Sequence, residues 1–494
     1  MSDEKKGHAD GTREDRETDP EASRGNTGGC PFHSGGNGSQ HQSGTERQDD
    51  TAQQQLAEKA VDRRAFMRSA LAIGGTGALA AAVGSSPVAA SGGDLGALDV
   101  PQGPRNPNAF PERQHAWKQD IKLDPFGNVV LPNHQLILFL NYVGDETQTG
   151  KERREVEAAF RTLERAFQRL AGGDHDADND GLVFMVGYSR AYFDRVDGNR
   201  PWAVDLQTPE QVLKKTDDDP SKADDHDAVV LLSSDTVPVL LASEAALFGE
   251  LDSLNGIDVR GTLAGVFDKA ERRTAFVGKG LPREKLDNDD IDDDAPLSMG
   301  YKSGFKDNVA TEDAVTISRG PFREGTTFQV SKLRLDLEKW YDRNRGERDK
   351  LMFSDEHSEE NIGNIGEGLE DDSNVTEDIV DSLEETAREK GRVGHAAKTA
   401  QARNDDFEPL ILRRSEGVNN EFQRNGKVDF NFSAVMEDIQ DFVETRQAMN
   451  ASHLDDRLDD DGDGILPFME VTNRATFLLP PRKRRSLPRA RPNY

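Results

Sequence analysis

Hydrophobic residues recur at regular intervals in two stretches of the chain, and both stretches predict the same order of elements. In the first, HQLILFLNYV at 134–143 predicts a strand, and apolar residues three or four apart over 149–170 predict a helix with one buried face. Further strands are predicted at 182–189, 228–233 and 273–278, with a helix at 236–251. This order, β-α-β-β-α-β, is that of a ferredoxin-like unit.

The second stretch repeats the order. Strands are predicted at 326–335, 410–414, 428–435 and 475–479, and helices at 336–353 and 436–450. Two such units in tandem can pack their sheets face to face, so we expect an α+β fold of the dimeric-α+β-barrel type with one pocket. An acidic insert at 355–390 has little apolar content and predicts a surface loop with one helix.

The remaining regions differ in composition from these two halves, which we place at 133–280 and 281–482. Residues 1–60 are polar and without periodicity, which predicts a disordered leader. Residues 91–132 are rich in Gly, Pro and Asn and predict an extended arm, and 483–494 form a basic tail.

An export signal is predicted at residues 61–90. Arg63 and Arg64 precede a weakly apolar, Gly/Ala-rich run at 69–83 and a small-residue site at 85–90. This pattern resembles a twin-arginine signal, which implies the twin-arginine export machinery as a partner and an extracytoplasmic or cell-surface location. The alternative is a short buried helix that begins with two arginines. No later apolar run approaches the roughly 20 residues of a membrane span.

Charge and cysteine content indicate which partners and which stabilising bonds are excluded. The chain has 92 acidic and 62 basic residues, a formal net charge of −30, which disfavours nucleic acid and anionic membranes as partners. We interpret the acidity of the folded part as adaptation to concentrated salt, with disorder as the alternative reading. Cys30 is the single cysteine, so no intramolecular disulfide forms; Cys30-Pro31 is either a passive segment or a weak heme ligand in cofactor handling.

Three segments carry candidate chemistry. They are Gly304-Phe305-Lys306-Asp307-Asn308, His395 within Gly394-His395-Ala396-Ala397, and Ile411-Leu412-Arg413-Arg414. In this order they resemble the dye-decolorising peroxidases, which have a GxxDG segment with a distal aspartate, a proximal histidine and an I-L-R-R strand. The resemblance covers roughly residues 130–482, and the tandem ferredoxin-like pattern agrees with that family's fold.

The resemblance implies a heme b cofactor and a peroxidase that uses hydrogen peroxide to oxidise an organic reductant, such as a dye-like or phenolic compound. His395 would be the axial ligand of the heme iron, and its second ring nitrogen would donate to a carboxylate or carbonyl. Asp307 would move the proton of peroxide, and Arg413 would stabilise the developing negative charge. Gly304, Phe305 and Asn308 would contact the cofactor, and Arg414, on the opposite face of its strand, would be structural.

Asn308 stands where the motif has its last glycine, and this departure keeps a second hypothesis open. The chain could be a non-catalytic heme- or iron-handling protein on the same fold. A third alternative is an exported protein that is stabilised by calcium and lacks heme. Homo-oligomerisation also stays open.

The calcium hypothesis rests on a loop with EF-hand spacing. Asp459, Asp461 and Asp463 would be ligands, with Gly464 at the turn and Glu470 as the bidentate ligand. Pro467 replaces the expected exiting helix, so an acidic solvated loop is the alternative. Asp176, Asp178, Asp180 and Gly181 repeat only the first half of the pattern.

Trp340 and Tyr341 are candidates for relaying electrons to a surface site, but as core aromatics they need no such role.

Overall fold

A computed structural model describes Leu98 and residues 100–144, 148–171, 177–277, 282–283, 286, 288–296, 299–418 and 427–492. The predicted leader, Cys30 and the predicted export signal lie outside the described residues. In the described part of the chain, no helix has both the length and the apolar character needed to cross a membrane.

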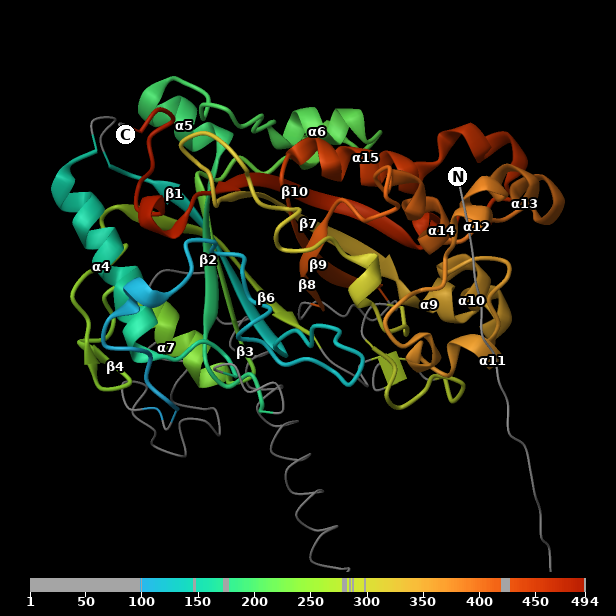
Figure 1. Ribbon diagram of the computed structural model, residues 1–494, viewed down its shortest axis with the longest axis horizontal. Coiled ribbons are helices and arrows are strands. Elements are labelled where there is room, and N and C mark those ends of the chain that lie inside the picture. Colours follow the sequence, from blue (N-terminus) through green and yellow to red (C-terminus); the bar gives the residue numbers. More distant parts are fainter. Residues whose placement is uncertain are drawn as a thin grey trace, which may run out of the picture. The chain divides into compact units, whose positions relative to one another are not determined.

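Eight antiparallel strands close into a barrel (Figure 1). The first half supplies β1 (His134–Tyr142), β2 (Val183–Ser189), β3 (Ala228–Ser234) and β6 (Phe267–Phe276), and the second half supplies β7 (Thr326–Asp336), β8 (Leu412–Val418), β9 (Lys427–Met436) and β10 (Met469–Leu479). Around the barrel the order is β1-β3-β2-β10-β7-β9-β8-β6, and β6 pairs with β1. Within each half the fourth, first, third and second strands are neighbours, which is the ferredoxin-like order and confirms the predicted tandem fold.

The helices of each half cover the outer face of its strands. On the first half, α4 (Gly150–Ala166) packs against α7 (Val237–Leu247). Helix α4 begins at a capping box, in which the Thr149 side chain accepts from the Glu152 N–H. On the second half, α15 (Ile439–Asn450) lies against β7 and β9 and contacts α14 (His395–Thr399) (Figure 1).

The inside of the barrel holds a buried apolar cluster, to which part of the predicted arm contributes. Phe139, Val330 and Phe477 belong to a buried cluster made of the strand residues that point away from the helices. Trp117 and Ile121 join this cluster and are both 0% exposed. The arm is therefore irregular in backbone but contributes to the core.

Three helical regions differ from the sequence prediction. The helix predicted at 336–353 is two helices, α9 (Leu337–Tyr341) and α10 (Arg345–Met352), because Asn344 caps a new start with its side chain. Two short helices, α5 (Arg190–Asp197) and α6 (Pro209–Lys215), were not predicted.

The acidic insert also differs from the prediction of a surface loop with one helix. It contains α11 (Glu359–Ile362), α12 (Glu377–Asp381) and α13 (Leu383–Lys390), which lie together with α9, α10 and α14 in Figure 1. Its buried residues Val375, Ile379, Leu383 and Ala387 recur every four residues and form a cluster with Val393 and Ala397. The insert thus supports the segment that carries His395.

The predicted basic tail is partly built into the first half. Arg485 of the tail and Arg482, the residue just before it, each donate to the buried carboxylate of Glu164 on α4, at 2.6 Å. Burial alone would raise the pKa of Glu164, but Arg485 and Arg482 lower it below its ordinary value.

The variant Glu164→Gln is expected to lower the free energy of unfolding by about 3 kcal/mol, because it removes the negative charge that pairs with both buried guanidiniums and leaves only Arg485 with another carboxylate, that of Glu157. Since the folded-state pKa is depressed, this stabilisation is present above the ordinary pKa of glutamate and is lost as pH falls through the folded value. Denaturant unfolding of both proteins at neutral and acidic pH measures the difference. The gap between them should shrink on acidification, and a constant gap would contradict the assignment.

Candidate functional site

The cavity that concerns function lies on the outer face of the second half. Its volume is about 260 Å³, and residues of β7, β8, β9 and β10 form one wall while α10, α14 and α15 contribute the other. Much of the lining is apolar, including Leu333, Leu335, Phe430 and Phe432 from the strands and Phe442 from α15. The space therefore suits a largely apolar molecule that also carries polar groups.

His395 lines this cavity from the first residue of α14. The preceding Gly394 is packed so closely that a Cβ atom there would overlap the carbonyl oxygen of Phe353. The same carbonyl accepts a hydrogen bond from the Ala397 N–H at 3.1 Å. Backbone contacts therefore fix where the His395 side chain emerges.

Gly394→Ala is expected to destabilise the fold by about 2 kcal/mol, because the atoms that a methyl group would meet belong to the backbone and cannot rotate away. Thermal unfolding measures this effect. Gly304→Ala is a useful comparison at an open position, since a Cβ there meets nothing within 4 Å and the cost comes from its φ of +75° alone. Equal stability of Gly394→Ala and the parent would contradict the close approach.

The His395 imidazole is neutral and lacks the predicted partner. Burial, together with the charges of Lys398 and Arg413, lowers the pKa of His395 to about 3. Its Nδ1 is buried and has no hydrogen-bond partner among the described residues. The carboxylate or carbonyl expected to accept from this nitrogen is thus not seen there.

The 304–308 segment contributes two residues to the lining of the cavity. Gly304 has a φ of +75°, and Phe305 is buried and lines the cavity. Asn308 also lines it, and its amide is fixed at both ends: Nδ2 donates to Asp372 at 2.7 Å and Oδ1 accepts from the Ser373 N–H at 2.6 Å.

Asp307 is not among the described residues that line the cavity. Its side chain is 54% exposed, and its carboxylate lies 3.6 Å from the Lys306 ammonium. Lys306–Asn308 form a 3-10 turn, so successive side chains point in different directions, and the contacts of Asn308 with Asp372 and Ser373 turn its side chain inward. The structure therefore leaves the Asp307 carboxylate outside the cavity in which it was predicted to move the proton of peroxide.

Arg413 and Arg414 lie on opposite faces of β8, as strand alternation predicts. Arg413 lines the cavity together with His395. Arg414 is buried on the other side, where it donates to the His115 carbonyl at 2.6 Å and pairs with Glu312 at 2.7 Å. The structure thus brings His395, Arg413, Phe305 and Asn308 to one cavity.

The predicted calcium loop does not form a ligand cluster in the described structure. The Asp463 carboxylate pairs with Lys398, and Asp461 pairs with Lys339 at 2.6 Å and with Arg343. These ammonium and guanidinium groups supply the positive charge that a cation would bring. Glu470 lies on β10, exposed and opposite Arg334, and Asp459 bonds through its backbone N–H to Gly391. Calcium is not supported here.

The remaining residues singled out in the sequence are the two candidates for electron relay and the second Asp-rich loop. Trp340 is 0% exposed, and its Nε1 donates to the Met299 carbonyl at 2.8 Å. Tyr341 is 7% exposed in the same cluster, so both are core aromatics. Asp176 lies outside the described residues, while Asp178 is 61% exposed and lies 3.5 Å from the Lys122 ammonium.

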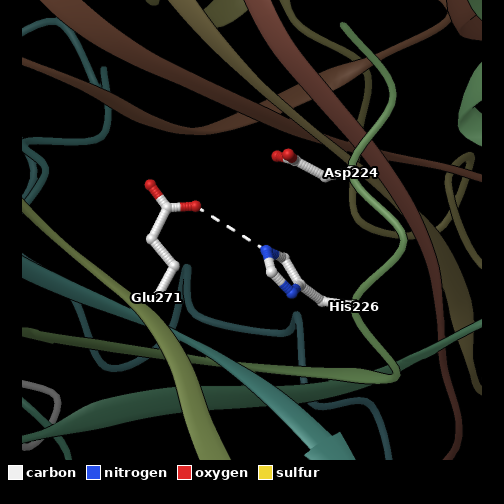
Figure 2. Close-up of side chains that lie close together, drawn as sticks. All are labelled: Asp224, His226 and Glu271. Carbon is white, nitrogen blue, oxygen red and sulfur yellow. Dashed lines mark ion pairs between the residues drawn. The ribbon is translucent and has the colours of Figure 1, made fainter. Parts of the chain in front are cut away.

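A second group of titratable side chains, Asp224, His226 and Glu271, lies at the first half (Figure 2). The Glu271 carboxylate points at the His226 ring, with Oε2 and Nε2 3.7 Å apart. However, the Arg273 guanidinium already bonds Asp224 at 2.7 Å and Glu271 at 2.6 Å. Burial would raise the pKa of Glu271, but the nearby His226 ring and the hydrogen bonds from Arg273 lower it to about 2. We interpret this group as an ion-pair network centred on Arg273.

Sequence reasoning missed three arginines of the cavity, Arg403, Arg446 and Arg474. Arg446 could have been recognised from the sequence. On the predicted helix 436–450 it follows Phe442 by four residues and precedes Met449 by three. It therefore shares their buried face, where a cation indicates a ligand or an ion pair.

Comparison with known proteins gives a family and a set of similar folds. Similar solved structures include a dye-decolorizing protein from V. cholerae (12% identity, TM-score 0.43, covering 75% of this chain and 98% of that chain). They also include DyPB from Rhodococcus jostii (14%, 0.45, 74% and 98%) and a dye-decolorizing peroxidase from Bacteroides thetaiotaomicron (12%, 0.44, 75% and 98%). No curated protein sequence matches the chain. A model of the "Family of unknown function (DUF7405)" matches residues 132–481, and the chain belongs to this family.

Proposed function

We propose that the cavity binds heme through His395 and that the chain is a heme-dependent peroxidase, which oxidises an organic reductant with hydrogen peroxide. The observation that carries this proposal is that His395 and Arg413 line one largely apolar cavity. When bound, heme supplies the redox chemistry of peroxide reduction.

The donor set of the cavity suits heme. An iron ligand must be unprotonated, and the lowered pKa of His395 keeps its imidazole neutral at ordinary pH. Because Nδ1 is enclosed by protein, Nε2 is the ring nitrogen left for a ligand in the cavity. Apolar walls from Leu333, Phe430 and Phe432 suit a macrocycle, and arginines of the wall suit its carboxylates.

Arg413 is the group of this wall that we expect to act on peroxide. A guanidinium keeps its charge at all relevant pH values and can hold an oxygen atom on which negative charge develops. The Asn308 amide can orient peroxide but cannot take up its proton, because an amide is not a base and both its polar atoms already have partners. No described lining residue is a carboxylate, so we expect water to carry the proton from one peroxide oxygen to the other.

Asp307→Asn is therefore expected to change the rate of peroxide reaction by only about two-fold, since a positioned acid–base group would contribute about 100-fold or more. The reaction of heme-loaded protein with peroxide, followed by stopped-flow absorbance, measures the rate. A loss of about 100-fold in Asp307→Asn would show that this carboxylate reaches the site in solution and would restore the original assignment.

The proposed function is tested by loading the purified protein with heme and adding peroxide with a phenolic or dye reductant. The expected result is a Soret band at one heme per chain and oxidation that requires peroxide and exceeds that of free heme. If the protein binds no heme, the proposal is wrong. If heme binds but no oxidation above free heme follows, the peroxidase part is wrong.

One observation favours a second candidate, a non-catalytic heme-binding protein. The described cavity wall has an amide, Asn308, and no carboxylate. In that case the experiment above gives stoichiometric heme binding without oxidation, and the variant Asn308→Asp should not create it.

A further inference from the structure

The polar lining of the cavity carries positive charge alone. Among its described residues are five cations, Lys302, Arg403, Arg413, Arg446 and Arg474, besides His395, and no aspartate or glutamate. Acidic residues outnumber basic ones by 92 to 62 in the chain, so this wall is opposite in charge to the chain's average. A wall of this kind favours an anionic occupant.

Two of the cations share one counter-ion. Asp218 accepts from Arg446 Nη2 at 3.1 Å and from Arg474 Nη1 at 2.7 Å. Arg446 Nε and Nη1 are buried and have no hydrogen-bond partner among the described residues. One carboxylate does not neutralise two guanidiniums, so this corner retains positive charge and donors that a bound acid could satisfy.

Arg403 lies at another place, beside the Asn308 wall. Burial lowers the pKa of Arg403, and the carboxylates that act on it, Asp372 and Asp307, belong to the Asn308 neighbourhood. None of the described carboxylates is within ion-pair distance of it, and its guanidinium lies over the Phe407 ring at 4.4 Å. Arg403 also lines a neighbouring hollow, so it stands where the cavity meets this outer space; the other polar residues of the hollow are Gln401, Asn404, Asp405, Glu444 and Gln447.

We propose that the cavity binds acidic groups at two separate places, one at the Arg446–Arg474 corner and a second at Arg403. This inference rests on the proposed function in taking an iron porphyrin as the occupant. The two carboxylates of heme b lie on one edge of the ring, so heme b alone can satisfy one place. The group at Arg403 comes either from a porphyrin with carboxylates on more than one edge or from an anionic reductant beside heme b.

The test compares iron porphyrins that share one ring, at a fixed salt concentration because screening weakens such contacts. The wild-type protein is titrated, by Soret absorbance, with heme b dimethyl ester, with heme b, and with an iron porphyrin tetracarboxylate. Separately, heme b-loaded protein is titrated with a sulfonated aromatic dye. Both titrations are repeated with Arg446→Gln, Arg403→Gln and, as a control, Arg388→Gln, whose side chain is 64% exposed on α13.

We expect heme b to bind about 10-fold more tightly than its ester, with this gain lost in Arg446→Gln, since one charge-assisted hydrogen bond contributes about that factor. For the second place we expect one of two results: either the tetracarboxylate binds about 10-fold more tightly than heme b, or the dye binds to heme b-loaded protein. Whichever of these is seen should be lost in Arg403→Gln and kept in Arg388→Gln. Tighter binding of the tetracarboxylate would show that the acidic group at Arg403 belongs to the porphyrin. Binding of the dye would show that it belongs to a separate reductant.

Equal affinities for the dimethyl ester and for heme b would overturn the claim that the Arg446–Arg474 corner binds an acidic group, but not the claim that the cavity binds heme. The site at Arg403 would be overturned if the wild-type protein neither binds the tetracarboxylate more tightly than heme b nor binds the dye. It would also be overturned if either effect persists in an Arg403→Gln protein that still binds heme b. If no porphyrin binds, the proposed function fails; dye binding to the unloaded protein, followed by fluorescence anisotropy, then tests the Arg403 site by itself. Loss of that dye binding in Arg403→Gln would support the site, and no difference from wild type would overturn it.

Discussion

His395→Ala protein is expected to lose stoichiometric heme binding, with an affinity at least about 100-fold below that of the wild type. Even residues that only orient a metal ligand contribute about 10- to 100-fold to metal affinity, so removal of the ligand itself should cost at least as much. The apolar walls remain in the variant, and we therefore expect weak residual binding of heme in place of complete loss. Titration with heme, followed at the Soret band, measures the affinity.

Two controls make the result specific. Imidazole added to His395→Gly should restore the Soret band, because the truncated side chain leaves room for the free ring. His453→Ala removes an exposed histidine on the turn after α15 and should bind heme as the wild type does. Tight, stoichiometric binding by His395→Ala would contradict the assignment of the iron ligand.

Arg413→Leu is expected to slow the reaction with peroxide by about 100- to 1000-fold, the loss typical when one donor to a developing negative charge is removed. Heme affinity should change far less, since His395 and the apolar wall remain. Arg413→Lys keeps the charge but loses the planar fork of donors, so an intermediate rate is expected. Stopped-flow absorbance of heme-loaded proteins measures all three rates.

A wild-type rate in Arg413→Leu would show that another group acts on peroxide, and the account would then lose its main catalytic residue. Equal losses in heme affinity and in rate would instead mean that Arg413 serves the fold or the cofactor. The ratio of the two effects therefore separates these roles.

The fold was predictable because the relevant signal is periodic and local. A continuous apolar run at 136–140 and the alternation of apolar and polar residues over 428–433 are both typical of strands, and the repeated order of elements gives the tandem topology. Closure of the barrel through β2–β10 and β6–β8 depends on contacts between distant segments, which no local pattern specifies.

The candidate site was predictable only in part. Strand alternation correctly separates Arg413 from Arg414, because a β-strand has a period of two. No such rule holds in the turn at Lys306–Asn308, where the Asp371 carbonyl accepts from the Asp307 N–H and sets which side chain points inward. Direction in an irregular segment is decided by partners far along the chain, so the placement of Asp307 could not be derived locally.

The calcium alternative is not supported, for a related reason. The spacing of Asp459, Asp461 and Asp463 satisfies a ligand pattern, but the sequence does not show which cations approach the loop. Lys339 comes from α9 and Lys398 from α14, both remote in sequence, and each takes one of the carboxylates.

The most direct test of the account is the resonance Raman spectrum of ferrous heme-loaded protein, which reports the bond between iron and an axial histidine. We expect one iron–histidine stretching band at low frequency, because His395 Nδ1 has no described acceptor that would strengthen the ligand. The band should be absent from His395→Gly and return when imidazole is added. A spectrum without an iron–histidine band in the wild type, or the same band persisting in His395→Gly, would contradict the claim that this histidine binds heme iron.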